Sequence, residues 1–464
     1  MKKITIQSIV LLSVLLMGSC SFLDKEPVSS FSAQGFYKTV SDAQAGVYGI
    51  YNGMQSAFRL NFAYWGEGRA DNVGTNHAGD PFALSRNTLT SLITTSNTAT
   101  SANWTSLYTI ISRANYAIKY IPEIFEDENN ALRNQLIGQS RALRAIAYFY
   151  LVRVWGDVPF TLEPFESAEQ DVFFSVTDKD VILDQIVDDL LYASEFCAPS
   201  YGGERDRVLV TQGSADGILT QVYMWRKQYA EAVITAQRVI DNPLYTLVSI
   251  GNWNNMFSTG LSNESVFEVG YNEIQTNGMR NLFAQGNDAQ YFPSEKFRES
   301  FEEGDLRKPK IWNNTQTTPR MIWKFFGEGF SDESPDPSQN NIILVRLADV
   351  MLLKAEAHAR LSQYSEALPL LNTIRKRAGL DALTEATAEE KFGDVVSAIM
   401  HERSIELCFE GHRWFDLVRT DKAIAVMEPI NGLDEPGNIV WPIHEDALNR
   451  NPNLDQNEFY RTKD

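Results

Sequence analysis

Three glutamates near the C-terminus are spaced so that their carboxylates could act together. Glu402, Glu406 and Glu410 follow one another every four residues, a spacing that predicts one face of a helix. Such a row could bind a metal ion or serve as an acid–base pair. Arg403 and Arg413 interleave with it, and this arrangement favours charge pairing within the fold. We therefore interpret the row as structural and assign it no catalytic role.

Spacings typical of other enzyme chemistries do not occur in the sequence. The five histidines form no H-E-x-x-H pair, and there is neither a G-x-x-x-x-G-K phosphate loop nor a G-x-S-x-G elbow. We expect no catalytic residue, metal or cofactor. The two carboxylates of a glycosidase need no fixed spacing, so this activity stays open as an alternative. Cys197 and Cys408 lie in helix-like patterns and are expected to be buried thiols.

Aromatic rings and hydrogen-bonding side chains gather in two segments without helical periodicity, roughly residues 62–103 and 251–341. Long loops on a rigid scaffold often carry binding groups. Flat aromatic faces beside amides, carboxylates or guanidinium groups suit a ligand that has both an apolar face and hydrogen-bonding groups. The candidate ligand-binding residues are Trp65, Asp71, Asn72, His77 and Phe82 in the first segment and Tyr291, Trp312 and Arg320 in the second.

The tryptophans divide into two groups by their surroundings. Trp312 follows a charged stretch and precedes Asn313 and Asn314, so we expect an exposed indole on which a ligand could stack. Trp65 and Tyr291 also have Gly, Asn or Asp as neighbours and are expected to be exposed. Helical spacing instead predicts core positions for four others, Trp104, Trp155, Trp225 and Trp414.

Helical hairpins must position these loops. The motif Gln-Tyr-Ala-Glu-Ala at residues 228–232 returns as Gln-Tyr-Ser-Glu-Ala at residues 363–367, and the apolar and small residues around each copy resemble a tetratricopeptide repeat. The sequence predicts a mostly α fold with several such hairpins, long irregular loops and little β structure. The predicted helical units cover roughly residues 104–156, 183–243, 343–379 and 395–418.

The N-terminus has the pattern of an export signal. Lys2 and Lys3 precede an apolar run, which ends in small residues before Cys20. The run is shorter than the ~20 residues of a membrane-spanning helix. Residues 16–20, Leu-Met-Gly-Ser-Cys, resemble a bacterial lipobox, so we expect cleavage after residue 19, acylation of Cys20 and a single mature domain over residues 20–464. Cleavage removes two lysines and shifts the net charge from −19 to −21, which disfavours nucleic-acid binding.

Several segments together resemble the SusD/RagB family of surface lipoproteins. Residues 22–27 are similar to its LD..P opening, and residues 141–159 to its helix that ends in G.VP. The C-terminal match is the most specific, with Glu-Gly-His-Arg-Trp-Phe-Asp-Leu at residues 410–417 and Trp-Pro-Ile at residues 441–443. Glu-Phe-Tyr at residues 458–460 departs from the common Pro-Gly-Tyr.

The resemblance implies a helical, SusD-like body with a surface ligand site built by irregular segments. It implies a binding protein without catalytic activity, lipid-anchored and exposed at the outer membrane, which forms a lid on a TonB-dependent, SusC-like transporter. Most relatives of this kind bind glycans, so we expect a glycan ligand. The alternatives are a peptide-binding RagB-like protein, a surface glycoside hydrolase and a protein-docking adaptor.

Overall fold

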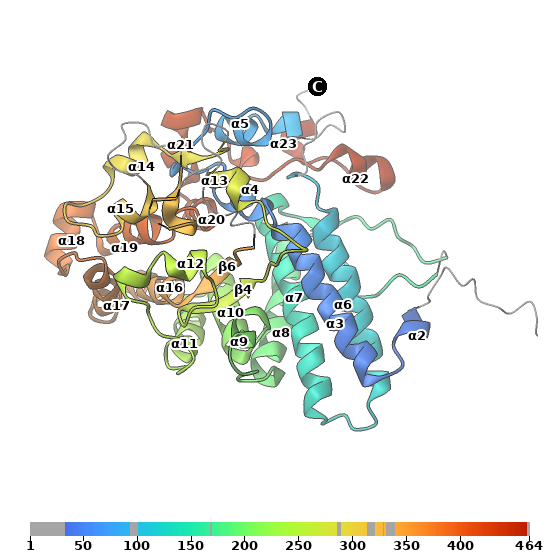
Figure 1. Cartoon of the computed structure of the whole chain (residues 1–464). Coiled ribbons are helices and arrows are strands. Elements are labelled where there is room, and N and C mark those ends of the chain that lie inside the picture. The colour runs from blue at the N-terminus through green and yellow to red at the C-terminus, as the bar shows by residue number, and fades with distance from the viewer. Residues whose placement is uncertain are drawn as a thin grey trace, which may run out of the picture.

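The computed structural model describes residues 33–92, 101–167, 169–284, 289–312, 321–327, 329–330 and 339–461. Long helices form one side of the molecule: α3 (Val40–Phe58), α6 (Thr105–Ile124), α7 (Ala131–Trp155) and α8 (Lys179–Phe196). Figure 1 shows α3, α6 and α7 side by side, and α8 packs against α7. Because α7 is covered by α3, α6 and α8, nearly every side chain in its C-terminal half is buried.

Side chains at the N-termini of these helices satisfy backbone groups that have no partner within the helix. Thr39 and Asp42 form a capping box at α3. The side chain of Asn130 accepts a hydrogen bond from the backbone N–H of Arg133 at α7, and Asp178 accepts one from Asp180 at α8. Capping residues in the sequence thus mark where α3, α7 and α8 begin, whereas α6 follows Trp104 without a side-chain cap.

Two helical hairpins follow the internal repeat. The first joins α10 (Gln212–Trp225) to α11 (Tyr229–Ile240), and the second joins α16 (Leu347–Arg360) to α17 (Tyr364–Arg377). Both turns contain a residue with positive φ immediately before the repeated Gln, Lys227 at 59° and Ser362 at 60°. The helices α11 and α16 also pack together, so the two hairpins are neighbours.

Three antiparallel pairs of short strands join distant parts of the described chain. They are β1 (Val73–Gly74) with β5 (Phe292–Pro293), β2 (Val158–Pro159) with β3 (Val176–Thr177), and β4 (Ser265–Val269) with β6 (Ile342–Arg346). The strands of the third pair are buried along their whole length, and β6 runs directly into α16. The prediction of a mostly helical fold with little β structure is confirmed.

Short helices connect and cover these elements, and several of them lie at the top of the view in Figure 1. They are α2 (Ala33–Phe36), α4 (Asn61–Gly66), α5 (Asp80–Ser85), η2 (Leu89–Leu92), α9 (Arg205–Val208), η3 (Ile250–Asn252), α12 (Asn255–Ser258), α13 (Met279–Phe283), α14 (Glu295–Glu299), α15 (Lys308–Ile311), η5 (Trp323–Phe325), α18 (Glu385–Phe392), α19 (Val395–Glu406), α20 (Arg413–Arg419), α21 (Ala423–Asn431), η6 (Pro436–Asn438), α22 (Glu445–Arg450) and α23 (Glu458–Arg461).

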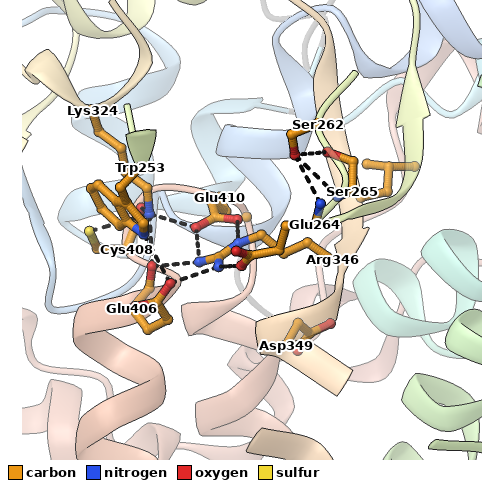
Figure 2. A network of polar contacts seen from close by, with 12 residues as sticks. Trp253, Ser262, Glu264, Ser265, Lys324, Arg346, Asp349, Glu406, Cys408 and Glu410 are labelled. Carbon is orange, nitrogen blue, oxygen red and sulfur yellow. Dashed lines mark hydrogen bonds and ion pairs between the residues drawn. The ribbon is translucent and has the colours of Figure 1, made fainter. Parts of the chain in front are cut away.

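A buried charge network joins β6, η5 and the end of α19 (Figure 2). The guanidinium of Arg346 donates at 2.7 Å to carboxylates of Glu264, Glu406 and Glu410. Lys324 Nζ donates to Glu410 Oε1 at 2.5 Å and to the carbonyl of Glu406 at 2.9 Å. Burial alone would raise the pKa of Glu406, but the surrounding cations outweigh it and hold the pKa well below its ordinary value.

The structural interpretation of the glutamate row is supported, but two details of it are wrong. The helix α19 ends at Glu406, so Glu410 lies in the following turn and not on the same helix. The interleaved arginines also pair elsewhere, Arg403 with Asp349 and Asp416, and Arg413 with Asp71. The glutamates form ion pairs with cations from other segments instead, among them Arg307, Lys324, Arg346, Arg375 and Arg377.

Candidate functional site

The pairing of β1 with β5 brings the two predicted ligand segments together. Val73 lies opposite Pro293, and Gly74 opposite Phe292. Hydrogen bonds beside the strands extend the junction: Thr75 Oγ1 donates to the carbonyl of Gln290 at 2.6 Å, and the Tyr64 hydroxyl donates to Gln290 Oε1 at 2.7 Å. Residues more than 200 positions apart in the sequence therefore share one surface.

The segment that follows β1 exposes an aromatic ring and polar groups. Phe82, on α5, is 43% exposed, and the guanidinium carbon of Arg86 lies 4.5 Å from its ring centroid. His77 is exposed, and its Nδ1 lies 2.7 Å from the carbonyl oxygen of Ala78. Gly79 before α5 has a φ of 84°, which turns the chain into the helix at little steric cost. An accessible ring beside an arginine offers both an apolar face and hydrogen-bond donors.

A cavity of about 410 Å³ opens next to the junction and contains Asp71 and Asn72 in its wall. We call it the Asp71 cavity. Its other walls come from α14, the C-terminal end of α16, α19, α20 and the start of α21. Six of its polar lining residues are Lys296, Ser300, Arg360, His401, Arg413 and Lys422.

Ion pairs and hydrogen bonds fix the two predicted residues in this wall. Arg413 donates to Asp71 through Nε at 2.8 Å and Nη2 at 3.1 Å, and Lys296 Nζ lies 3.1 Å from Asp71 Oδ2. Burial opposes ionisation of Asp71, but the two cations outweigh it and lower its pKa to about 2. Ser404 Oγ donates to Asn72 Oδ1 at 3.1 Å. Burial lowers the pKa of His401 to about 4, so this imidazole is neutral near pH 7.

The expectation that Trp65, Tyr291 and Trp312 are exposed is wrong. Their exposed fractions are 0%, 0% and 2%, which leaves no ring face for a sugar in this conformation. Trp65 Nε1 donates to the carbonyl of Ser101 at 2.9 Å. The centroid of Trp312 lies 5.2 Å from that of Phe301 and 6.0 Å from that of Phe297. Polar residues flank Trp312 in the sequence, but its indole packs against Phe301 and Phe297, which lie 11 and 15 positions earlier.

Other predictions have mixed outcomes. Trp104, Trp155 and Trp414 are buried as expected, and Trp225 is half-buried and packs against the core. Cys197 and Cys408 are confirmed as buried free thiols. Arg320 and Cys20 lie outside the described residues. No pattern in the sequence indicates that Lys296, Arg360 and Lys422 share a cavity with Asp71, because they come from separate elements.

A second cavity, of about 570 Å³, lies between α3, α9 and β4. Neutral groups dominate its lining, among them Tyr48, Asn52, Gln55, Asn272 and Gln275. Its charged lining residues are Glu204, Arg205 and Glu268. Burial raises the pKa of Glu268, and its carboxylate already accepts hydrogen bonds from Asn341 and the backbone of Leu261.

Within the described part of the chain, no three His, Cys, Asp or Glu side chains converge in a way that could hold a metal ion. No helix in the same ranges is both long and apolar enough to cross a membrane.

Both halves of the chain match models of known families. Residues 252–460 match the SusD family, and residues 21–224 match a family described as starch-binding and associating with the outer membrane. The SusD-like protein P38 of Formosa agariphila is 30% identical over 99% of both chains. A SusD-like protein of Bacteroides ovatus is 23% identical over 88% of this chain and 81% of its own length.

Solved structures show the same fold. A SusD homologue from Bacteroides thetaiotaomicron has a TM-score of 0.80 at 24% identity, with coverage of 93% of this chain and 100% of its own. A laminarin-binding SusD-like protein has a TM-score of 0.75 at 23% identity, with coverage of 91% and 100%.

The matches define a class of mostly helical glycan-binding proteins whose description associates them with the outer membrane. The chain belongs to the SusD/RagB family, and the resemblance predicted from its sequence is confirmed.

Proposed function

We propose that this protein captures an oligosaccharide or polysaccharide at the junction of β1 and β5 without transforming it. The observation that carries the proposal is the pairing of Val73–Gly74 with Phe292–Pro293, which unites two loop segments beside an open cavity. Phe82 supplies an accessible apolar face, and Arg86 supplies donors beside it. Membership in a family that includes a laminarin-binding structural neighbour favours a glycan as the ligand.

The proposal includes a place for the protein in the cell. Acylation at Cys20 would hold it at the outer membrane, with the glycan site facing outward and a TonB-dependent, SusC-like transporter as its partner. The N-terminal pattern of lysines, an apolar run and a lipobox-like cysteine supports the anchor. Co-purification of a large barrel protein in gentle detergent, and loss of membrane association in Cys20→Ala, are the expected results. Isolation of the native protein alone would contradict the partnership.

The binding proposal is tested by calorimetric titration of the mature protein with a panel of polysaccharides, oligosaccharides and peptides. Phe82→Ala should weaken glycan binding about three- to tenfold, the range expected for the loss of one aromatic contact. The matched control is Phe173→Ala, since Phe173 is also 43% exposed but lies before β3, away from the site. Equal effects of the two variants would contradict the assignment of Phe82.

Two outcomes of the same panel would replace the proposal. Binding of peptides alone would indicate a RagB-like uptake protein. Sustained release of reducing ends from a bound glycan by the pure protein would indicate a glycoside hydrolase.

A further inference from the structure

The Asp71 cavity has a charge balance opposite to that of the whole chain. Lysine and arginine number 41 in the sequence against 60 aspartates and glutamates. Four cations nevertheless line this cavity against two carboxylates, which belong to Asp71 and Asp394. Because the protein as a whole repels anions, a local excess of positive charge is what an anionic ligand would need in order to bind there.

Both carboxylates of the cavity already have partners. Asp71 is held by Arg413 and Lys296. Asp394 caps α19, where it accepts a hydrogen bond from the backbone N–H of Ser397 at 2.5 Å. Neither carboxylate is therefore oriented to neutralise the two remaining cations.

Few carboxylates of the protein compete with a ligand for the remaining cations, Arg360 and Lys422. Arg360 Nη2 lies 3.4 Å from Glu356 Oε1, but Arg419 approaches the same carboxylate more closely, at 2.7 Å and 2.9 Å. Lys422 is exposed, and no carboxylate of the described residues lies within ion-pair distance of its ammonium. Both side chains are thus available to an incoming anion.

The rest of the lining suits a sugar better than a bare inorganic ion. Val396, Met400 and Leu417 supply an apolar wall, and Ser300 and Thr420 supply hydroxyls. The volume of about 410 Å³ falls within the roughly 300–1,000 Å³ typical of small-molecule sites. A sugar ring with an apolar face, hydroxyls and one negative group would contact the apolar wall, the hydroxyls and the two cations, respectively.

We propose that the Asp71 cavity binds a negatively charged group of the captured glycan, a carboxylate or a sulfate ester, through Arg360 and Lys422. This inference rests on the proposed function and specifies its ligand class. Arg360 can donate two parallel hydrogen bonds to a planar carboxylate or to two sulfate oxygens, whereas Lys422 acts as a point charge on a flexible stem. The apolar wall then packs against the ring that carries the anionic group.

The test compares charged glycans with neutral counterparts of the same backbone. The mature protein is titrated with oligogalacturonate and with its methyl ester, and with a sulfated galactan oligosaccharide and its desulfated form. At least one charged member should bind about tenfold more tightly than its neutral counterpart at low salt, and the preference should shrink at high salt. The member that shows the preference tells whether carboxylate or sulfate is recognised.

Variants locate the preference within the cavity. Arg360→Gln together with Lys422→Gln should weaken binding of the charged glycan about tenfold and leave binding of the neutral one unchanged. Lys179→Gln is the control, because Lys179 is half-exposed and begins α8, outside the cavity. Unchanged binding of the charged glycan by the double variant would overturn the inference.

The panel distinguishes failure of this inference from failure of the proposed function. If neutral glycans bind and charged ones bind no better, the inference fails while glycan capture stands. If no glycan binds at all, both fail.

Discussion

The molecule contains two collections of arginine, lysine and carboxylate that differ in burial and in pairing. In the network around Arg346 (Figure 2), that side chain and Glu406 are fully buried. Each of its carboxylates, on Glu264, Glu406 and Glu410, pairs with two or three cations. In the Asp71 cavity, Arg360 and Lys422 reach solvent with little or no carboxylate contact. Residue type alone does not distinguish a structural cluster from a binding surface, but exposure and unused bonding capacity do.

The buried network also explains how the loops beside the site are held. Lys324, in η5, is fully buried and donates to the carbonyls of Glu406 and Cys408 at 2.9 Å. Its ammonium lies 4.7 Å from the ring centroid of Trp253. A segment of the second loop region is thereby bound to the end of α19, so the network stabilises the scaffold on which the cavity is built.

The largest expected effect is on stability, from a change inside the network. Arg346→Met removes the donor shared by Glu264, Glu406 and Glu410 and leaves buried carboxylates short of partners. We expect a loss of about 3–5 kcal/mol in the free energy of unfolding, measured by urea denaturation. Arg360→Gln, in the cavity, should change it by less than about 1 kcal/mol. Equal free energies of unfolding for the two variants would contradict the view that the Arg346 network stabilises the fold and the cavity cations do not.

A loss of comparable size is expected at Trp312, in the aromatic cluster. Trp312→Ala should cost about 3–5 kcal/mol because the indole is enclosed by Phe297 and Phe301. Phe82→Ala should leave the urea midpoint nearly unchanged and act on glycan binding instead. If Trp312→Ala unfolds at the wild-type midpoint, this ring does not belong to the core.

A smaller, pH-dependent effect is expected at Glu67, which is buried near the network but forms no ion pair among the described residues. Its Oε1 accepts a hydrogen bond from the backbone N–H of Gly411 at 3.1 Å, and burial raises its pKa to about 8. The folded protein therefore binds this proton more tightly than the unfolded chain. The resulting stability is complete below pH 4.5 and is lost as the pH rises to about 8.

The Glu67→Gln variant isolates this contribution. The amide stays uncharged and can still accept the Gly411 hydrogen bond, so the variant should gain stability relative to wild type between pH 5 and pH 8. Unfolding free energies from urea titrations at both pH values give the difference. A difference that does not change with pH would show that Glu67 is ionised in the folded protein.

Local patterns predicted the helical scaffold well. The repeated motif places the hairpin turns correctly because the positive-φ residue, Gln228 or Gln363 and the helix start lie within a few positions of one another. Helical periodicity likewise identified Trp155 and Trp414 as core residues. Such features depend on residues that are close in the sequence, and a local sequence pattern reports only on those residues.

The candidate site was predicted only in part because its contacts are distant in the sequence. Asp71 was identified as a candidate ligand residue, but its partner Arg413 lies 342 positions away. Trp312 was placed wrongly because the polar stretch beside it does not reveal Phe297 and Phe301. A single sequence fixes neither which distant side chains meet nor which ring face they cover.

Hydrogen–deuterium exchange with and without the tightest-binding glycan of the panel tests the central claim most directly. Bound ligand should slow backbone exchange in residues 71–86 and 289–300, where β1, α5, β5 and α14 surround the junction and the Asp71 cavity. The second cavity, lined by residues 48–55 and 270–275, should exchange as before. Protection confined to the second cavity, with no change at the junction, would contradict the account.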